Sequence, residues 1–184
     1  MALTRLQARD GYLIGSIALF LDRNLKQPYD AEVATLTFPT PLTIDRGKPD
    51  DKGLTLTVPR IMIDTISGTE SKRAYELGSN TLWRHMNLVF YCYPSTVNSD
   101  SDFEASDLLK TYMRDTFGTS FIRIVDYSNP LCTATNILFC SDVAEVVRVQ
   151  DPVDRKLPSL LAEEAHRFDM HVSIRYPVSE SDAT

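Results

Sequence analysis

Apolar residues near the start of the chain recur at steps of three, four and seven positions, which is the period of one helical face. Thr4 and Gln7 have the spacing of a capping box, so the helix is expected to begin there. Gly11 and Gly15 each lower helix stability by about 1 kcal/mol relative to alanine, which predicts a close packing contact along their side. Pro28 lacks a backbone donor and is predicted to end the helix. The apolar positions are Leu6, Leu13, Ile14, Ile17, Leu21 and Leu25.

The pattern changes after this helix, because five of the ten prolines lie between positions 28 and 59. Two segments there, 33–38 and 54–63, alternate in the manner of strands. The polar segment 45–53 contains two glycines and a proline, so we expect a mobile turn between the two strands.

The strongest strand pattern covers residues 82–93, where aromatic side chains are frequent. Ser101 and Glu104 then form a second capping box, and apolar residues keep helical spacing as far as Phe117. Gly118 stands where a helix C-cap is expected. These residues predict a second main helix.

The rest of the chain predicts strands at 121–127 and 143–149, a short helical or irregular stretch at 159–165, and a last strand at 166–176. The last strand alternates with period two, so one face is expected to be buried and the other solvated. The buried set is Phe168, Met170, Val172, Ile174 and Tyr176, and the polar set is Arg167, Asp169, His171, Ser173 and Arg175.

This order of elements shows no regular βαβ repetition. It predicts an α+β fold: a mostly antiparallel β-sheet, two main helices packed on one face, and long loops rich in proline and glycine. We expect one domain over residues 1–178 and a flexible, polar tail over residues 179–184.

Composition excludes some classes of protein. The chain has 184 residues and a net charge of −6, with a pI near 5.0, which excludes a basic protein that coats nucleic acid. Its hydrophobic fraction of 43 % is typical of a globular protein. The apolar run 12–21 is about half of the roughly 20 residues that cross a bilayer, so we expect a core helix, with no export signal and no membrane partner. Cys92, Cys132 and Cys140 lack paired spacing and are predicted to be buried thiols.

No residue pattern predicts a catalytic centre, a metal site or a bound cofactor. His166 and His171 are five apart on one predicted strand and therefore point to opposite faces, and His85 has no acidic neighbour in sequence. The acids of segment 98–104 resemble the start of a calcium loop, but Phe103 stands where glycine is required. A helix N-terminus, which favours acidic residues, explains them better.

One enzymatic alternative is a metal-dependent nuclease. Pro49-Asp50 followed by Glu70-Ser71-Lys72 matches a pattern in which two carboxylates hold Mg²⁺ and a lysine faces the attacked phosphate. In such nucleases the second element lies on a strand between apolar neighbours, whereas here it lies in a polar segment flanked by glycines. The pattern is also short enough to recur by accident.

A protein that works by contact is the other interpretation. The two long loops of mixed charge, 45–53 and 65–80, are natural contact surfaces. Within the second loop, Lys72, Arg73, Tyr75 and Glu76 are the predicted interface residues, with solvated loops of no function as the plain alternative.

From Pro59 onward the chain resembles the tail terminator and related neck proteins of long-tailed bacteriophages, over about two thirds of its length. The resembling segments are 59–64, 75–78, the strand 83–91 that contains Arg84, the helix 104–117, the two strands after it, and 165–176. The segments 28–53 and 131–140 are longer than the family pattern.

The resemblance implies a virion protein without enzymatic activity at the head–tail junction. It implies a ring, usually of six copies, that caps the tail tube, binds the tail tube protein and docks the head-completion or connector protein. Genomic DNA would pass through the ring without specific binding, and the charge of −6 fits an acidic lumen that repels phosphates. A neck or head-completion protein is the alternative within the family, while the nuclease and a dimerising cytosolic adaptor are alternatives of other classes. The ring hypothesis predicts that mutation of Arg73, Tyr75 or Arg84 changes assembly.

Overall fold

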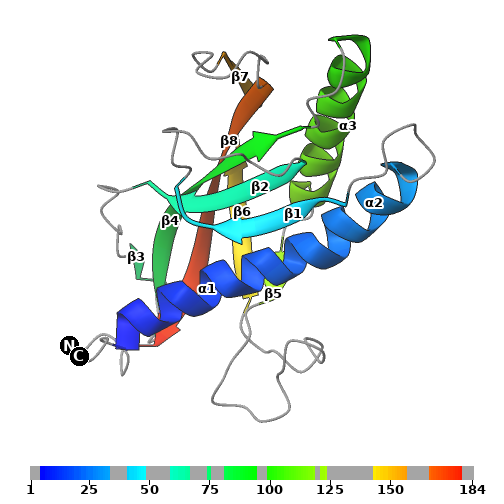
Figure 1. The fold of residues 1–184 in the computed structure, drawn as a ribbon. Coiled ribbons are helices and arrows are strands. Elements are labelled where there is room, and N and C mark those ends of the chain that lie inside the picture. Colours follow the sequence, from blue (N-terminus) through cyan, green and yellow to red (C-terminus); the bar gives the residue numbers. More distant parts are fainter. Residues whose placement is uncertain are drawn as a thin grey trace.

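Eight strands form one sheet in the order β1-β2-β4-β8-β6-β5, with β3 beside β4 and β7 beside β8 (Figure 1). β1 and β2 are parallel, and every other recorded pair is antiparallel. The strands are β1 Thr43–Arg46, β2 Arg60–Thr65, β3 Ala74–Tyr75, β4 Thr81–Tyr93, β5 Phe121–Arg123, β6 Val143–Val149, β7 Val153–Lys156 and β8 His166–Ser179. The computed structural model describes residues 5–33, 41–48, 59–66, 74–75, 81–94, 99–118, 121–123, 143–156 and 166–179.

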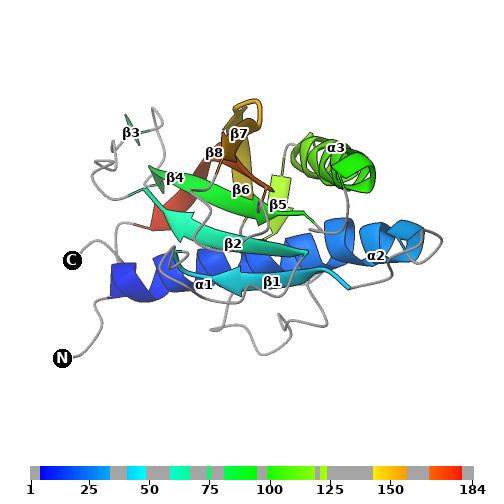
Figure 2. The ribbon, with the colours of Figure 1, turned by 45° about the horizontal axis from the view of Figure 1, so that its top comes forward.

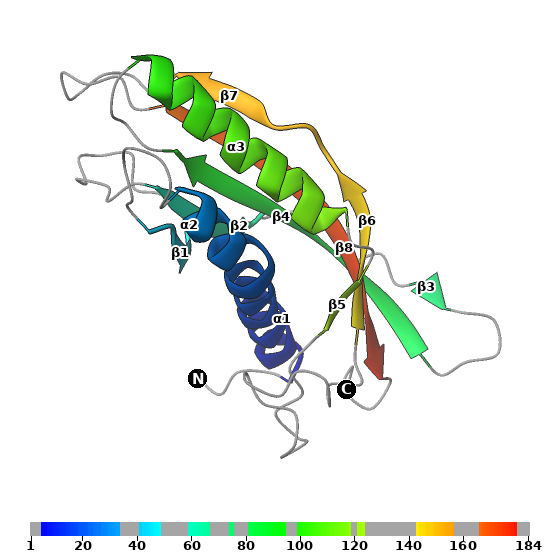
Figure 3. The same cartoon turned by 90° about the vertical axis from the view of Figure 1, so that its right-hand side faces the viewer.

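The helices lie on one side of this sheet (Figure 3). They are α1 Arg5–Leu21, the π-helical turn η1 Asp22–Lys26, α2 Gln27–Val33 and α3 Ser99–Phe117. α1 crosses the sheet and contacts both β1 and β5, while α3 contacts η1 and β6 (Figure 2). The predicted fold class, α+β with a mostly antiparallel sheet and helices on one face, is confirmed.

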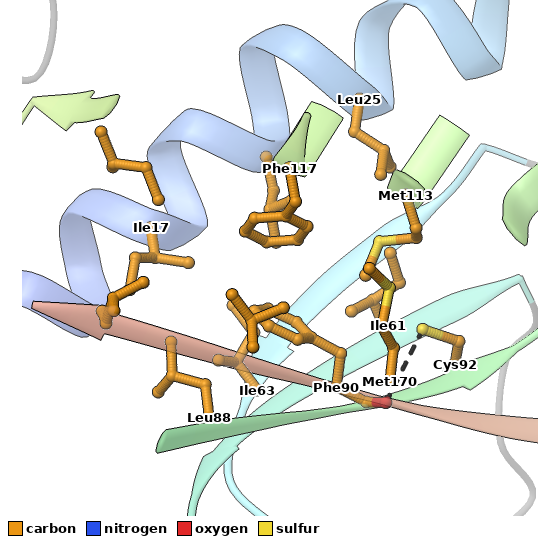
Figure 4. Packing of buried hydrophobic residues seen from close by; sticks show 14 of the residues in the cluster. Ile17, Leu25, Ile61, Ile63, Leu88, Phe90, Cys92, Met113, Phe117 and Met170 are labelled. Atoms are coloured by element: carbon orange, nitrogen blue, oxygen red, sulfur yellow. Dashed lines mark hydrogen bonds between the residues drawn. The ribbon is translucent and has the colours of Figure 1, made fainter. Parts of the chain in front are cut away.

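The core lies between the helices and the sheet (Figure 4). The helical positions Leu13, Ile17, Leu21 and Leu25, predicted from their spacing, are fully buried. Apolar side chains from β2, β4, β8 and α3 meet them, and burial of this apolar surface is the main stabilising term of such a fold. These partners include Ile61, Ile63, Leu88, Phe90, Met113, Phe117 and Met170.

The first helix does not end at Pro28, so that prediction is wrong. The helix passes through η1, whose following residue Gln27 donates its N–H to the carbonyl of Asp22, and continues as α2. A proline deprives the carbonyl four residues earlier of its helical donor. That carbonyl belongs to Asn24, and it accepts a hydrogen bond from the Thr116 hydroxyl of α3 at 3.4 Å. Tertiary contact therefore replaces the bond that the proline removes.

Other elements and boundaries also differ from the sequence prediction. Asp45 and Arg46, expected in a mobile turn, belong to β1, and Val33 is helical rather than extended. β7 was not predicted. α3 begins at Ser99, before the predicted capping box, and Gly118 caps its end by donating to the carbonyl of Arg114 at 2.8 Å. Segments 34–40, 51–58, 124–127, 159–165 and 180–184 lie outside the described residues.

β8 confirms the buried half of the predicted alternation, whereas the face expected to be solvated is only partly exposed and Asp169 on it is buried. The five apolar side chains face the helices and are at most 1 % exposed. The strand also runs to Ser179, which pairs with Thr81, so the chain stays extended past the predicted end of the strand.

Candidate interaction surfaces

The predicted interface residues lie at one end of β4, as far as the structure describes them. Tyr75 belongs to β3 rather than to a loop and pairs with Leu82. Arg84, two residues further along β4, pairs with Tyr176 of β8. Lys72, Arg73 and Glu76 lie outside the described residues.

The residues of the nuclease alternative, Asp50, Glu70 and Lys72, also lie outside the described residues. Within the described ranges, no group of three or more His, Cys, Asp or Glu side chains could hold a metal ion. The three histidines occupy separate register positions, with His85 opposite Arg175, His171 opposite Val89 and His166 opposite Lys156.

Arginine is frequent on the sheet face opposite the helices, here called the open face, although the chain as a whole is acidic. Among the described side chains, six arginines and four acidic residues occupy register positions on this face. Aromatic residues of β4 lie between them. The arginines are Arg60, Arg123, Arg148, Arg155, Arg167 and Arg175, and the acids are Asp45, Asp64, Glu145 and Asp169.

Asp169 is the buried centre of the open face. Its side chain is 8 % exposed and accepts a hydrogen bond from Arg155 Nε of β7 at 3.1 Å. Arg167 Nε lies 2.9 Å from Asp169 Oδ1, but neither atom has a hydrogen bond of good geometry, so this contact is an ion pair. The Arg167 guanidinium also lies over the rings of Tyr91 and Tyr93, at 5.2 and 5.9 Å. A buried carboxylate is tolerable only with such partners.

A second cluster occupies the other half of the same face. Arg175 pairs with Glu145 of β6, and its guanidinium lies 4.8 Å from the centroid of the Trp83 ring. Between the two clusters, the Ser173 hydroxyl donates to Asn87 at 2.6 Å. These ion pairs and ring contacts join side chains of β4, β6, β7 and β8 into two polar clusters on the open face.

Two buried groups that could otherwise act as nucleophiles are held protonated. Burial raises the pKa of the Cys92 thiol well above its ordinary value, and the charge of Asp169 raises it further. Burial raises the pKa of Tyr29 to about 12, with a smaller contribution from Asp30. Cys92 is fully buried, as predicted, while Cys132 and Cys140 lie outside the described residues.

A groove of about 520 Å³ separates the helix from the edge strand β1. Gly15 forms part of its wall, and a Cβ atom there would lie 2.7 Å from the Arg46 guanidinium. The prediction of a close contact at Gly15 is therefore confirmed. The groove is lined by Gly15, Ala18, Leu19, Asp22, Lys26, Pro41, Leu42, Thr43, Ile44 and Arg46.

Sequence reasoning missed Arg155, Trp83 and Glu145 as members of the arginine clusters. The alternation of 166–176 placed Arg167, Asp169 and Arg175 on one face, but their partners come from strands far away in sequence. Only the strand register shows which residues meet.

No protein-family model matches the chain, and no curated protein is significantly similar to it. None of the described helices is long and apolar enough to cross a membrane.

Proposed function

We propose that the protein is a non-enzymatic structural component of the head–tail junction of a long-tailed phage, a tail terminator that forms a ring and caps the tail tube. The open face is the observation that carries the proposal beyond the sequence resemblance. A broad polar sheet surface, with arginines that contact carboxylates and aromatic rings, suits extended contact with another protein. Aromatic residues and arginine are enriched at such interfaces.

The distribution of charge supports an orientation of the subunit in the ring. α3 contains five acidic and two basic residues, whereas arginine exceeds acid on the open face. An acidic surface repels DNA, and an arginine-rich surface attracts it. In the proposed ring the helical side, with α3, therefore faces the channel, and the open face meets the tail tube protein, the head-completion protein or other virion components.

Negative-stain imaging and native mass measurement of the purified chain, alone and with tail tubes of the phage that carries it, test the proposal. We expect rings, or caps on tube ends. A compact monomer that never binds a tube would overturn the proposal, and binding to filled heads alone would favour the neck protein. Monomers in dilute solution are compatible with the proposal, provided that caps form once tubes are added.

Variants separate this function from the nuclease. Arg84→Ala and Tyr75→Ala are expected to reduce capping, because both residues belong to the predicted interface at one end of β4. Their register partners Tyr176 and Leu82 place them on the helical face, so this contact lies at the end of the sheet beside the channel and is separate from the open face. Asp50→Ala and Glu70→Ala are the matched controls and should cap tubes normally. Cleavage of DNA that requires Mg²⁺ and is lost in the two controls would establish the nuclease instead.

A further inference from the structure

The two edges of the sheet differ in sequence but can continue one another. One edge is β1, whose only recorded partner among the described strands is β2. At the other edge, β5 covers only residues 143–145 of β6, so the end of β6 lies beyond its described partner. Val147, Val149 and Val153 along this edge are 50, 36 and 46 % exposed. An exposed apolar edge is a template for pairing with another strand.

The backbone groups of the two edges point outward at matching positions. The N–H of Thr43 donates to the carbonyl of Pro59, just before β2, at 3.0 Å, and the N–H of Gly47, just after β1, donates to the carbonyl of Ile63 at 2.8 Å. Successive residues of a strand direct their backbone groups to opposite sides, so the N–H and C=O of Ile44 point away from β2, toward the open edge of the sheet. Just after β6, the N–H of Gln150 donates to the carbonyl of His171 in β8 at 2.9 Å. Because the direction alternates along the strand, the N–H and C=O of Val149 point away from β8, toward the edge.

The side chains of the edges are complementary in the same register. β1 and β6 run in opposite directions within one sheet. If a second copy stands beside the first in the same orientation, β1 of one copy and β6 of the other are therefore antiparallel. When Asp45 stands opposite Arg148, Ile44 stands opposite Val149. Asp45 and Arg148 both lie on the open face, and Ile44 and Val149 both lie on the helical face. Among the described residues, no carboxylate forms an ion pair with the Arg148 guanidinium.

The groove beside β1 lies next to the position that a strand paired with β1 would take. It lies on the helical face, where Ala18, Leu19 and Ile44 form its apolar part. A Val149 side chain that projects to this face from a docked β6 would enter the groove. The outward backbone groups, the opposite charges and the apolar pair therefore all select the same register.

We infer that β1 of one copy pairs antiparallel with β6 of a second copy, with Asp45 opposite Arg148. The interface is heterologous, and repetition of it produces a closed ring when the rotation between copies closes, or a filament when it does not. The inference rests on the proposed function, because it names the surface by which the ring forms.

Val149→Pro tests the backbone pairing. This substitution removes an outward N–H and no hydrogen bond within the sheet, so the monomer should stay folded. Val149→Thr is the matched control, because it keeps both the N–H and the branched shape. We expect at least about tenfold loss of rings and tube caps for Val149→Pro, the effect of one or two lost interface hydrogen bonds. Unchanged assembly of Val149→Pro would overturn the inference.

Charge exchange tests the register. D45R and R148D should each place like charges opposite one another and reduce assembly about tenfold. An equimolar mixture of the two variants should restore assembly. In a ring where the two variants alternate, every interface again joins opposite charges. D45R also removes the ion pair of Asp45 with Arg60 of β2, at 3.0 Å, so recovery in the mixture is the result that identifies the interface. Loss of assembly without recovery in the mixture would overturn the pairing. Thermal unfolding of each variant verifies that its monomer is folded.

The outcomes separate the inference from the proposed function. If the wild-type chain caps tubes and Val149→Pro caps them equally well, the function stands and the edge pairing falls. If the chain forms rings that Val149→Pro abolishes but never binds a tube, the edge pairing stands and the function falls. A wild-type chain that stays monomeric at every concentration and on tubes overturns both.

Discussion

Asp169 is the carboxylate that joins Arg155 and Arg167 in one cluster on the open face. Its carboxylate is nearly buried between Arg155 and Arg167, and removal of one partner from a buried ion pair leaves an uncompensated charge. We expect Asp169→Asn to lower the free energy of unfolding by about 3 kcal/mol. Chemical denaturation measures this loss.

Asp154→Asn is the control for that experiment. Asp154 also pairs with a basic residue, Lys110 of α3, at 2.8 Å, but its side chain is 73 % exposed. An exposed pair contributes less than about 1 kcal/mol. Equal losses in the two variants would show that the burial of Asp169 does not determine its contribution.

The sequence predicts only some of the contacts around Asp169. Period-two alternation identified Asp169 and Arg167 as neighbours on one face, since a strand fixes that relation locally. Nothing local indicates that Arg155 or Tyr91 joins them. Arg155 reaches the cluster because β7 pairs with β8, and Tyr91 because β4 pairs with β8.

At the scale of the element, the helix that continues through Pro28 depends on α3. Thr116→Val removes the hydroxyl that donates to Asn24, while helix propensity stays nearly the same. We expect a loss of about 1 kcal/mol in the free energy of unfolding, because the Asn24 carbonyl then lacks this donor. Thr111→Val is the matched control on α3, since its hydroxyl bonds to Asp107 of the same helix in an exposed position. The control should change stability by less than about 0.5 kcal/mol, and an equal loss in both variants would refute the role of Thr116.

Elements were predictable where their own residues carry the pattern. β4, α3, β6 and β8 each contain enough apolar residues at the right spacing, and the sequence predicted all four. β1 and β7 each have a single apolar residue, Ile44 and Val153, and were missed. Pairing with longer neighbours, β2 and β8, makes these two segments extended. Short strands at the edge of a sheet depend on the register of the sheet, which the local pattern does not contain.

At the scale of the whole molecule, the acidic helix α3 and the arginine-rich open face lie on opposite sides of the sheet. Asp107 and Asp115 of α3 are exposed, on an element that is acidic overall, while the open face is rich in arginine. If the helical side lines the channel of a ring, several copies of these acids face the DNA together. Mutual repulsion then keeps the phosphates from binding the wall as the genome passes.

A phage carrying Asp107→Lys and Asp115→Lys tests this arrangement through the rate of DNA ejection. Lysines at these positions bind phosphates and release counterions, so ejection should slow by about two- to tenfold at low salt and recover at high salt. The Asn pair at the same positions removes the acids without adding positive charge and should slow ejection less. All variants should still cap tubes, because neither residue belongs to β1, β6 or the open face. Ejection at the normal rate by the lysine variant would place α3 away from the channel and leave the open face as the surface that the DNA passes.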